Sequence, residues 1–247
     1  MDRVIYTSLS TMRGSMARQT AVANNLANVQ TPGFRAEIAS AQSVWLDGQS
    51  LGTRAMASEE VLGANMAVGK VVQSGRALDI ALQGDTLLTV QAANGDVAYT
   101  RRGDLQLSPT GLLTTGDGLP VQGAQGPITV GAADSISIDN SGRIFIVPPG
   151  GDPQQPVELD RLKLVTPAGS DIAKGLDGLF RPREGGILPE DPAARLVSGA
   201  IEGSNVNSTS ALVEMIEASK AWDVQLKLIS SVRDMDNATS GLMRLPS

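Results

Sequence analysis

Apolar residues recur at helical spacing near the start of the chain. The intervals are 4, 3, 4, 7 and 3 residues along a stripe formed by Ile5, Leu9, Met12, Met16, Ala23 and Leu26. Because the stripe averages one apolar position in roughly 3.5 residues, it predicts a helix. The helix would run from about residue 2 to residue 27, a length of about 39 Å. The turn Thr31-Pro32-Gly33 is expected to follow its end.

A second stripe lies near the end of the chain and predicts a longer helix, from about residue 210 to residue 243. Its members are Leu212, Met215, Trp222, Leu226, Ile229, Val232, Met235 and Leu242. Both stripes are narrow, as in a coiled-coil seam. They therefore predict that the two helices pair as an antiparallel coiled coil. One interpretation is a simple helical hairpin, and the other is that both helices also pack against neighbouring subunits.

Short alternating runs between the two stripes predict an antiparallel β domain, which makes the fold class α+β. Three hairpins are expected, around the turns Asn94-Gly95, Ser108–Gly111 and Asp139–Gly142. A further alternating run covers residues 159–165, whereas most of 167–192 is expected to be loop. The predicted divisions are an N-terminal helix (1–30), an extended or irregular connection with some strand (31–74), the β domain (75–197), a return hinge (198–209) and a C-terminal helix (210–247).

Composition removes several classes of function. The chain has no His and no Cys, which excludes imidazole bases, thiol nucleophiles, disulfides and the usual zinc and haem ligands. Its net charge of −6 is unlike that of a nucleic-acid binder. No apolar run is long enough to span a membrane, and the N-terminus lacks the apolar core of a signal peptide. The chain is therefore expected to be cytoplasmic or to be exported without a cleaved signal.

Two further classes of function fit the sequence less well than a structural role does. A carboxylate-based carbohydrate enzyme would need two acids placed across a cleft, but the candidate acids stand beside turns, where acids are usually structural: Asp79, Asp85, Asp96 and Asp104. A peptidoglycan-binding module would need an aromatic platform, and the chain has only three Phe, two Trp and two Tyr. We therefore expect no enzyme, no cofactor and no metal site.

Two motifs carry a resemblance to a known family. The first is Ala23-Asn24-Asn25-Leu26-Ala27-Asn28, continued by Val29-Gln30-Thr31-Pro32-Gly33-Phe34-Arg35, and the second is Gly199-Ala200-Ile201-Glu202-Gly203-Ser204-Asn205-Val206-Asn207. Together they resemble the terminal signatures of the bacterial flagellar rod and hook proteins. Weaker similarity covers residues 76–85 and 98–105. The chain departs from the family pattern at Ile201 and Lys220, which replace Leu and Arg, at Trp222, which replaces a smaller aromatic residue, and at Thr86-Leu87-Leu88, which replaces Gly-Phe-Phe.

The resemblance implies a structural subunit of the flagellar rod. Such proteins polymerise helically with copies of themselves and with other rod subunits, and the rod transmits motor torque across the periplasm to the hook. They are delivered by the flagellar type III export apparatus without a cleaved signal, and they neither bind nucleic acid nor insert into the membrane. The opening residues 1–7 and the modest length are most similar to the proximal rod subunit. The distal rod subunit is the alternative.

The predicted assembly interface combines the helical stripes with the two motifs. Its residues are Ile5, Leu9, Met12, Met16, Asn24, Asn25, Leu26, Asn28, Gly33, Phe34, Ser204, Asn205, Val206, Asn207, Met215, Trp222, Leu226 and Ile229. The three Asn near residue 25 are expected to satisfy backbone groups where the first helix ends, partly across subunits. Gly33 is expected to adopt a positive φ. The segment 204–207 is either a plain helix cap or the hinge into the C-terminal helix.

Overall fold

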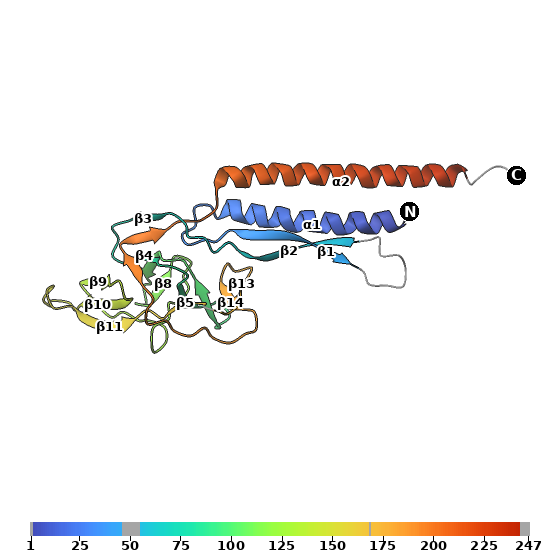
Figure 1. Ribbon diagram of the computed structural model, residues 1–247. Coiled ribbons are helices and arrows are strands. Elements are labelled where there is room, and N and C mark those ends of the chain that lie inside the picture. The colour runs from blue at the N-terminus through green and yellow to red at the C-terminus, as the bar shows by residue number, and fades with distance from the viewer. Residues whose placement is uncertain (1, 46–54, 168, 243–247) are drawn as a thin grey trace. The chain divides into compact units, whose positions relative to one another are not determined.

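The computed structural model describes residues 2–45, 55–167 and 169–242 (Figure 1). The chain divides into two compact units. We call residues 1–27, 37–63 and 207–247 the helical unit, and residues 28–36 and 64–206 the β unit. The chain thus passes between the units several times, and neither unit is one continuous segment.

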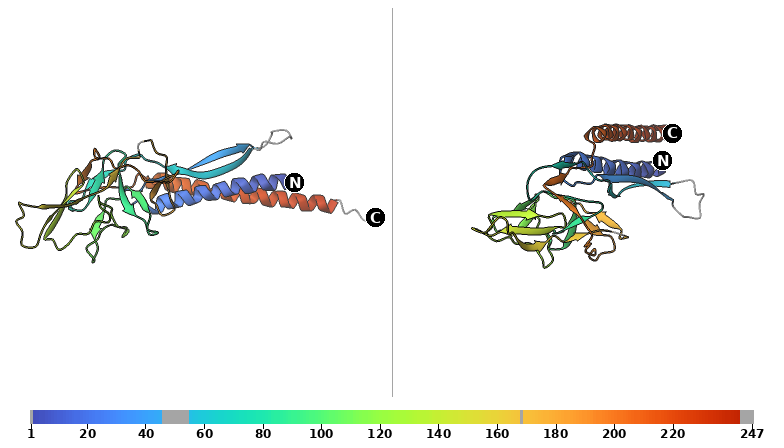
Figure 2. Two further views of the ribbon diagram at one scale, coloured as in Figure 1. Left: turned by 90° about the horizontal axis from the view of Figure 1, so that it is seen from below. Right: turned by 60° about the vertical axis from the view of Figure 1, so that its left-hand side comes forward.

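The helical unit is built on two antiparallel helices. Helix α1 (Asp2–Ala27) has 26 residues, and helix α2 (Ser208–Leu242) has 35. Strands β1 (Glu37–Trp45) and β2 (Ala55–Ala64) pair in a two-stranded sheet. Helix α1 contacts α2 and also β1, so it lies between the second helix and the strand pair (Figures 1 and 2).

The predicted antiparallel coiled coil is wrong, although a helix does stand at each end of the chain. A coiled coil buries large apolar side chains along its seam, but Met16, Leu226 and Met235 are 61%, 45% and 57% exposed. Small and polar residues also take part in the contact. The Gln225 Nε2 group donates to Ser15 Oγ at 3.0 Å, and Ala218 is buried close by. The side chains of Ile5 and Leu9 lie outside the described ones.

The β unit is antiparallel throughout its named strand pairs. Its largest sheet has the order β12-β5-β6-β14-β13, and the three-stranded sheet has the order β11-β10-β9. Three two-stranded sheets pair β15 with β4, β16 with β3, and β7 with β8. The strands are β3 (Val71–Gln73), β4 (Ile80–Leu82), β5 (Leu87–Gln91), β6 (Val97–Thr100), β7 (Leu105–Leu107), β8 (Leu113–Thr115), β9 (Ser135–Ile138), β10 (Arg143–Val147), β11 (Val157–Arg161), β12 (Leu164–Val165), β13 (Ile172–Lys174), β14 (Phe180–Pro182), β15 (Leu196–Ser198) and β16 (Ala200–Glu202).

The three predicted hairpins are confirmed, because their turns dictate the pairing locally. Strand β5 pairs with β6 across Asn94-Gly95, β7 with β8, and β9 with β10. Most of residues 167–192 is loop, as predicted, although β13 and β14 pair within this stretch. These strands have only three residues each, too few for an alternating pattern to emerge. The expected run at 159–165 is divided between β11 and β12.

The core of the β unit is aliphatic. Its main cluster includes Ile80, Leu88, Leu105, Ile144 and Leu164, all 2% exposed or less. A smaller cluster contains two aromatic side chains, Tyr99 and Phe180, and the Tyr99 hydroxyl accepts a hydrogen bond from the backbone N–H of Leu188 at 2.7 Å. Burial raises the pKa of Tyr99 above its ordinary value. The scarcity of aromatic residues is thus compensated by many branched side chains drawn from different strands.

None of the helices in the described residues is long and apolar enough to cross a membrane.

The start of α2 is fixed by a polar cap. The Asn207 Oδ1 atom accepts hydrogen bonds from the backbone N–H groups of Thr209 and Ser210, at 3.0 and 3.1 Å. This geometry satisfies donors that the first turn of a helix leaves without intrahelical partners.

We expect Asn207→Ala to destabilise the helical unit by about 1 kcal/mol, because it removes this acceptor. Thermal unfolding followed by far-ultraviolet circular dichroism measures the effect. Asn207→Asp keeps an oxygen at the same place and should leave the transition nearly unchanged. Equal losses in the two variants would show that the cap contributes nothing.

Candidate assembly junction

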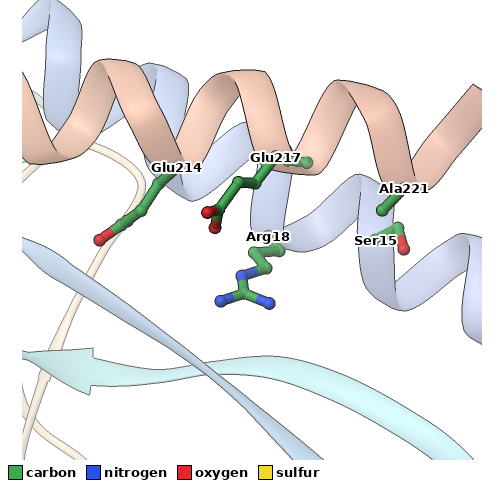
Figure 3. A pocket seen from close by; sticks show the side chains of 6 residues that line it. Ser15, Arg18, Glu214, Glu217 and Ala221 are labelled. Carbon is green, nitrogen blue, oxygen red and sulfur yellow. The ribbon is translucent and has the colours of Figure 1, made fainter.

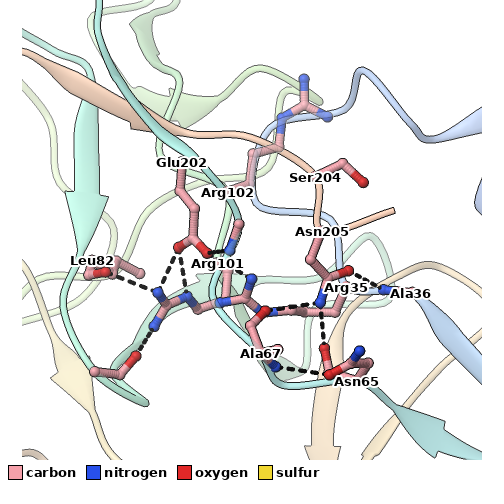
Figure 4. Close-up of polar contacts among 12 residues, drawn as sticks. Arg35, Ala36, Asn65, Ala67, Leu82, Arg101, Arg102, Glu202, Ser204 and Asn205 are labelled. Atoms are coloured by element: carbon pink, nitrogen blue, oxygen red, sulfur yellow. Dashed lines mark hydrogen bonds and ion pairs between the residues drawn. The ribbon is translucent and has the colours of Figure 1, made fainter. Parts of the chain in front are cut away.

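The two sequence motifs meet in the β unit. The backbone N–H of Gly33 donates to the carbonyl of Glu202 at 2.7 Å, and the N–H of Asn205 donates to the carbonyl of Phe34 at 3.2 Å. We call residues 33–36, 65–70, 101 and 202–205 the junction (Figure 4). The junction therefore joins the segment that follows α1 to the segment that precedes α2.

Gly33 fits the junction because it has no side chain. Its φ is +66°, which confirms the predicted positive value. A Cβ atom at this position would lie 2.3 Å from the carbonyl oxygen of Arg101, which is backbone and cannot swing away. Both the backbone conformation and the close approach therefore require glycine.

The Asn205 side chain links its own segment to two other segments of backbone. Its Oδ1 accepts from the N–H of Ala36 at 2.7 Å, and its Nδ2 donates to the carbonyls of Asn65 and Ala67 at 2.7 and 2.8 Å. An amide is suited to this position because it offers an acceptor and two donors on one small group. The neighbouring Ser204 Oγ accepts from the N–H of Val206 at 3.2 Å, which shapes the turn toward α2.

Three charged side chains are buried at the centre of the junction. Arg35, Arg101 and Glu202 are each 1% exposed. The Glu202 Oε2 atom accepts from Arg101 Nε at 3.1 Å and from Nη2 at 2.5 Å. The Oε1 atom lies 2.6 Å from Arg35 Nη1 and accepts from the N–H of Gly69 at 2.8 Å. Two guanidinium groups thus share one carboxylate.

The two arginines are not equally satisfied. Arg101 also donates to the carbonyls of Leu82, Gly84 and Thr86, at 2.6 to 2.8 Å. In contrast, the Nε and Nη1 atoms of Arg35 have no hydrogen-bond partner among the described residues, although Nη1 faces the Glu202 carboxylate. Burial, and to a lesser degree the charge of Arg101, lower the pKa of Arg35. Arg35 is therefore held mainly by Coulombic attraction.

Phe34 lies beside this cluster and packs against a cation. The Lys174 Nζ atom is 3.6 Å from the centre of the Phe34 ring and donates to the carbonyl of Arg35 at 3.0 Å. This arrangement combines a cation–π contact with a hydrogen bond. It anchors strand β13 to the motif that follows α1.

The predicted Asn cluster divides between the two units. In the helical unit, Asn25 exchanges two hydrogen bonds with the backbone of Glu37, and Asn24 Nδ2 donates to the Glu37 carboxylate at 2.6 Å. In the β unit, Asn28 Oδ1 accepts from the Thr31 hydroxyl at 3.0 Å. Asn25 thus satisfies backbone groups at the start of β1, and the contribution of these residues across subunits stays a prediction.

The remaining predicted residues do not gather at one site. Met12, Leu26, Met215, Trp222 and Ile229 are half-buried in the helical unit, whereas Met16 and Leu226 are exposed. The predicted set missed Arg101, Glu202 and Arg35, which form the centre of the junction. A charged residue at the end of a short apolar run, as in Ala200-Ile201-Glu202, was the available signal.

A small notch of about 170 Å³ lies between α1 and α2 (Figure 3). It is lined by Ser15, Arg18, Glu214, Glu217, Ala218 and Ala221. The side chains of Ser15, Ala218 and Ala221 are too small to fill the space between the two helices. Within the described part of the chain, no cluster of three or more acidic residues could hold a metal ion.

Comparisons with known proteins identify the family. Three family models match: "Flagella basal body rod protein" over residues 5–35, "Flagellar hook protein FlgE/F/G D1 domain" over 81–146, and "Flagellar basal body rod FlgEFG protein C-terminal" over 197–242. The chain is 39% identical to the flagellar basal-body rod protein FlgF of Salmonella typhimurium over 99% of this chain and 100% of that protein. The chain belongs to the flagellar basal-body rod protein family.

Other relatives support the FlgF-type interpretation over the FlgG-type alternative. FlgF of Escherichia coli is 40% identical, again over 99% of this chain and 100% of the relative. FlgG of Bacillus subtilis is 30% identical over 94% of this chain and 95% of its own length. The protein is therefore a structural rod subunit of the flagellar basal body and not an enzyme.

Gly33→Ala should destabilise the β unit by about 2–4 kcal/mol, because it combines a strained φ with a clash against the Arg101 backbone. Chemical denaturation measures the loss. Gly118→Ala is the matched control, since Gly118 has φ +81° but open space around it. The control should cost only about 1 kcal/mol, and similar losses in both variants would contradict the clash.

Substitutions at the buried charges should have unequal effects. Glu202→Gln leaves two buried cations without their carboxylate and should cost about 3–5 kcal/mol. Arg35→Met should cost clearly less, because two Arg35 donors already lack hydrogen-bond partners. Combining the two changes should recover part of the loss caused by Glu202→Gln. A double-mutant cycle measures the coupling, and simple additivity would contradict a shared carboxylate.

Proposed function

We propose that this subunit polymerises with copies of itself and with other rod subunits into a helical shaft in the periplasm, and that the helical unit supplies the main contacts. The exposed apolar surface of α2 carries this proposal. On the side turned from its half-buried residues, α2 presents Val213, Ile216, Val224, Leu228 and Met235, each 50% exposed or more. A helix that is apolar on opposite sides normally has partners on both.

The proposed interface adds these residues to the set expected from the sequence. Within that set, Leu226 and Met16 are exposed and available to a neighbouring subunit, whereas the junction residues act by fixing the segments that lead into the helices. The same surface on every copy would meet a different surface on the next, and such a contact builds an open helical polymer rather than a closed dimer.

The position and delivery of the subunit form a second part of the proposal. Family membership supports a place in the proximal rod, torque transmission to the hook, and export by the flagellar type III apparatus without a cleaved signal. The division into residues 1–30, 31–74, 75–197, 198–209 and 210–247 stays a prediction. It assigns the inner contacts to the first and last of these segments.

A charge placed on the outer side of α2 should block assembly without unfolding the subunit. We expect Ile216→Asp and Val224→Asp to abolish swimming and to prevent incorporation into isolated basal bodies, because each buries a carboxylate in an apolar contact. Circular dichroism of the purified chain should keep its helical signal, since both side chains are exposed.

Ser210→Asp is the matched control for this experiment. Ser210 is exposed in the first turn of α2, where a negative charge is favourable. This variant should assemble and swim normally. Normal basal bodies in the Ile216→Asp and Val224→Asp strains would show that this side of α2 is not an interface.

A further inference from the structure

The β unit is closed by its last segment. Strand β15 pairs with β4, with Leu196 opposite Leu82, and β16 pairs with β3, with Glu202 opposite Val71. Each of these sheets has two strands. Strands β3 and β4 therefore receive their named strand partners from residues near the end of the unit, although Ile80 N–H also donates to the carbonyl of Gly103.

The same segment completes the aliphatic core. Leu196 is 1% exposed and belongs to the cluster that contains Ile80 and Leu82. Ala200, the first residue of β16, is fully buried. Gly199, with φ +72°, turns the chain between them, and its carbonyl accepts from the N–H groups of Ser74 and Gly75. Without this segment, β4 would expose apolar side chains and lose its ladder.

The segment also delivers the charge that the junction needs. Glu202 is the carboxylate that faces both Arg35 and Arg101. Asp85 adds only a minor attraction to Arg35. Before Glu202 docks, closing the junction would bury two guanidinium groups against each other, which is strongly unfavourable. Asn205 then fixes the docked segment through its three backbone contacts.

We propose that residues 196–206 act as a latch on which the folding of the whole β unit depends. The β unit then folds in one cooperative transition, which requires the latch to be paired with β3 and β4. If the chain emerges N-terminus first, the β unit stays unfolded until residue 195 has passed. Until then, strands β3 and β4 lack their strand partners, and Arg35 and Arg101 lack the Glu202 carboxylate. This inference concerns folding and stands independently of the proposed polymerisation.

Hydrogen exchange on the full chain tests the latch. Latch opening is reported by the amides of Gly199 and Gly203, which donate to Asp79 and Lys70, and core opening by the amides of Thr89 and Gln91, which donate to Lys163 and Pro120. If the latch is obligatory, both sets exchange at matching opening constants. Glu202→Gln should speed both sets together, by about a hundredfold or more.

The control is Asp177→Asn, which removes an exposed ion pair with Arg181 in the same unit. It should change exchange by no more than about fivefold. Rapid exchange of the Gly199 and Gly203 amides in unmodified chain, while Thr89 and Gln91 stay protected, would overturn the proposal. That pattern would mean that the segment opens locally while the rest of the unit remains folded.

An engineered disulfide decides the question if Glu202→Gln fails to fold. Val72 and Ile201 are opposite each other in the β3–β16 pair. The natural chain contains no Cys, so two introduced cysteines can pair only with each other. With V72C and I201C oxidised, the latch cannot leave, so exchange should slow at Thr89 and Gln91 as well as at the latch. Slowing confined to the latch amides would refute the coupling, and the reduced form of the same variant is the control.

Discussion

The Glu202 carboxylate, shared by two buried guanidinium groups, is the interaction on which the rest of the β unit depends. Its oxygens meet Arg101, Arg35 and the backbone of Gly69. Because a buried pair is costly to leave half-made, the three segments that carry these groups must come together in one arrangement. The gain is specificity: the residues after α1 and the residues before α2 are held at fixed places in one unit.

This arrangement explains why the two motifs stand so far apart in the sequence. Gly33 and Asn205 both act on backbone within the junction. Gly33 allows a close approach because it has no side chain, and Asn205 uses the acceptor and the donors of its amide group. Each motif alone resembles a helix cap. Together they join the segment that follows α1 to the segment that precedes α2 within the β unit.

Local patterns allowed the hairpins to be predicted, because Asn94-Gly95 and similar turns act over a few residues. The junction could not be predicted in the same way. Its contacts join residues that only the complete set of strands brings together, and Arg35 and Glu202 gave no periodic signal. The coiled coil failed for another reason. Heptad spacing identifies apolar positions, but α2 is apolar on several sides, so spacing alone could not show that Ser15, Ala218 and Gln225 would form the contact.

Buried charged clusters often mark active sites, and the same physics shows why this one does not. Glu202 accepts from the Gly69 N–H and from Arg101 and faces Arg35, so its contacts are all with groups of the junction itself. The Glu202 side chain is 1% exposed, so it does not face solvent. This carboxylate holds two arginine side chains and the backbone of Gly69 in place. In this chain, the buried polar groups hold the segments of the junction together, and the surface through which we propose that subunits meet is the apolar outer side of α2.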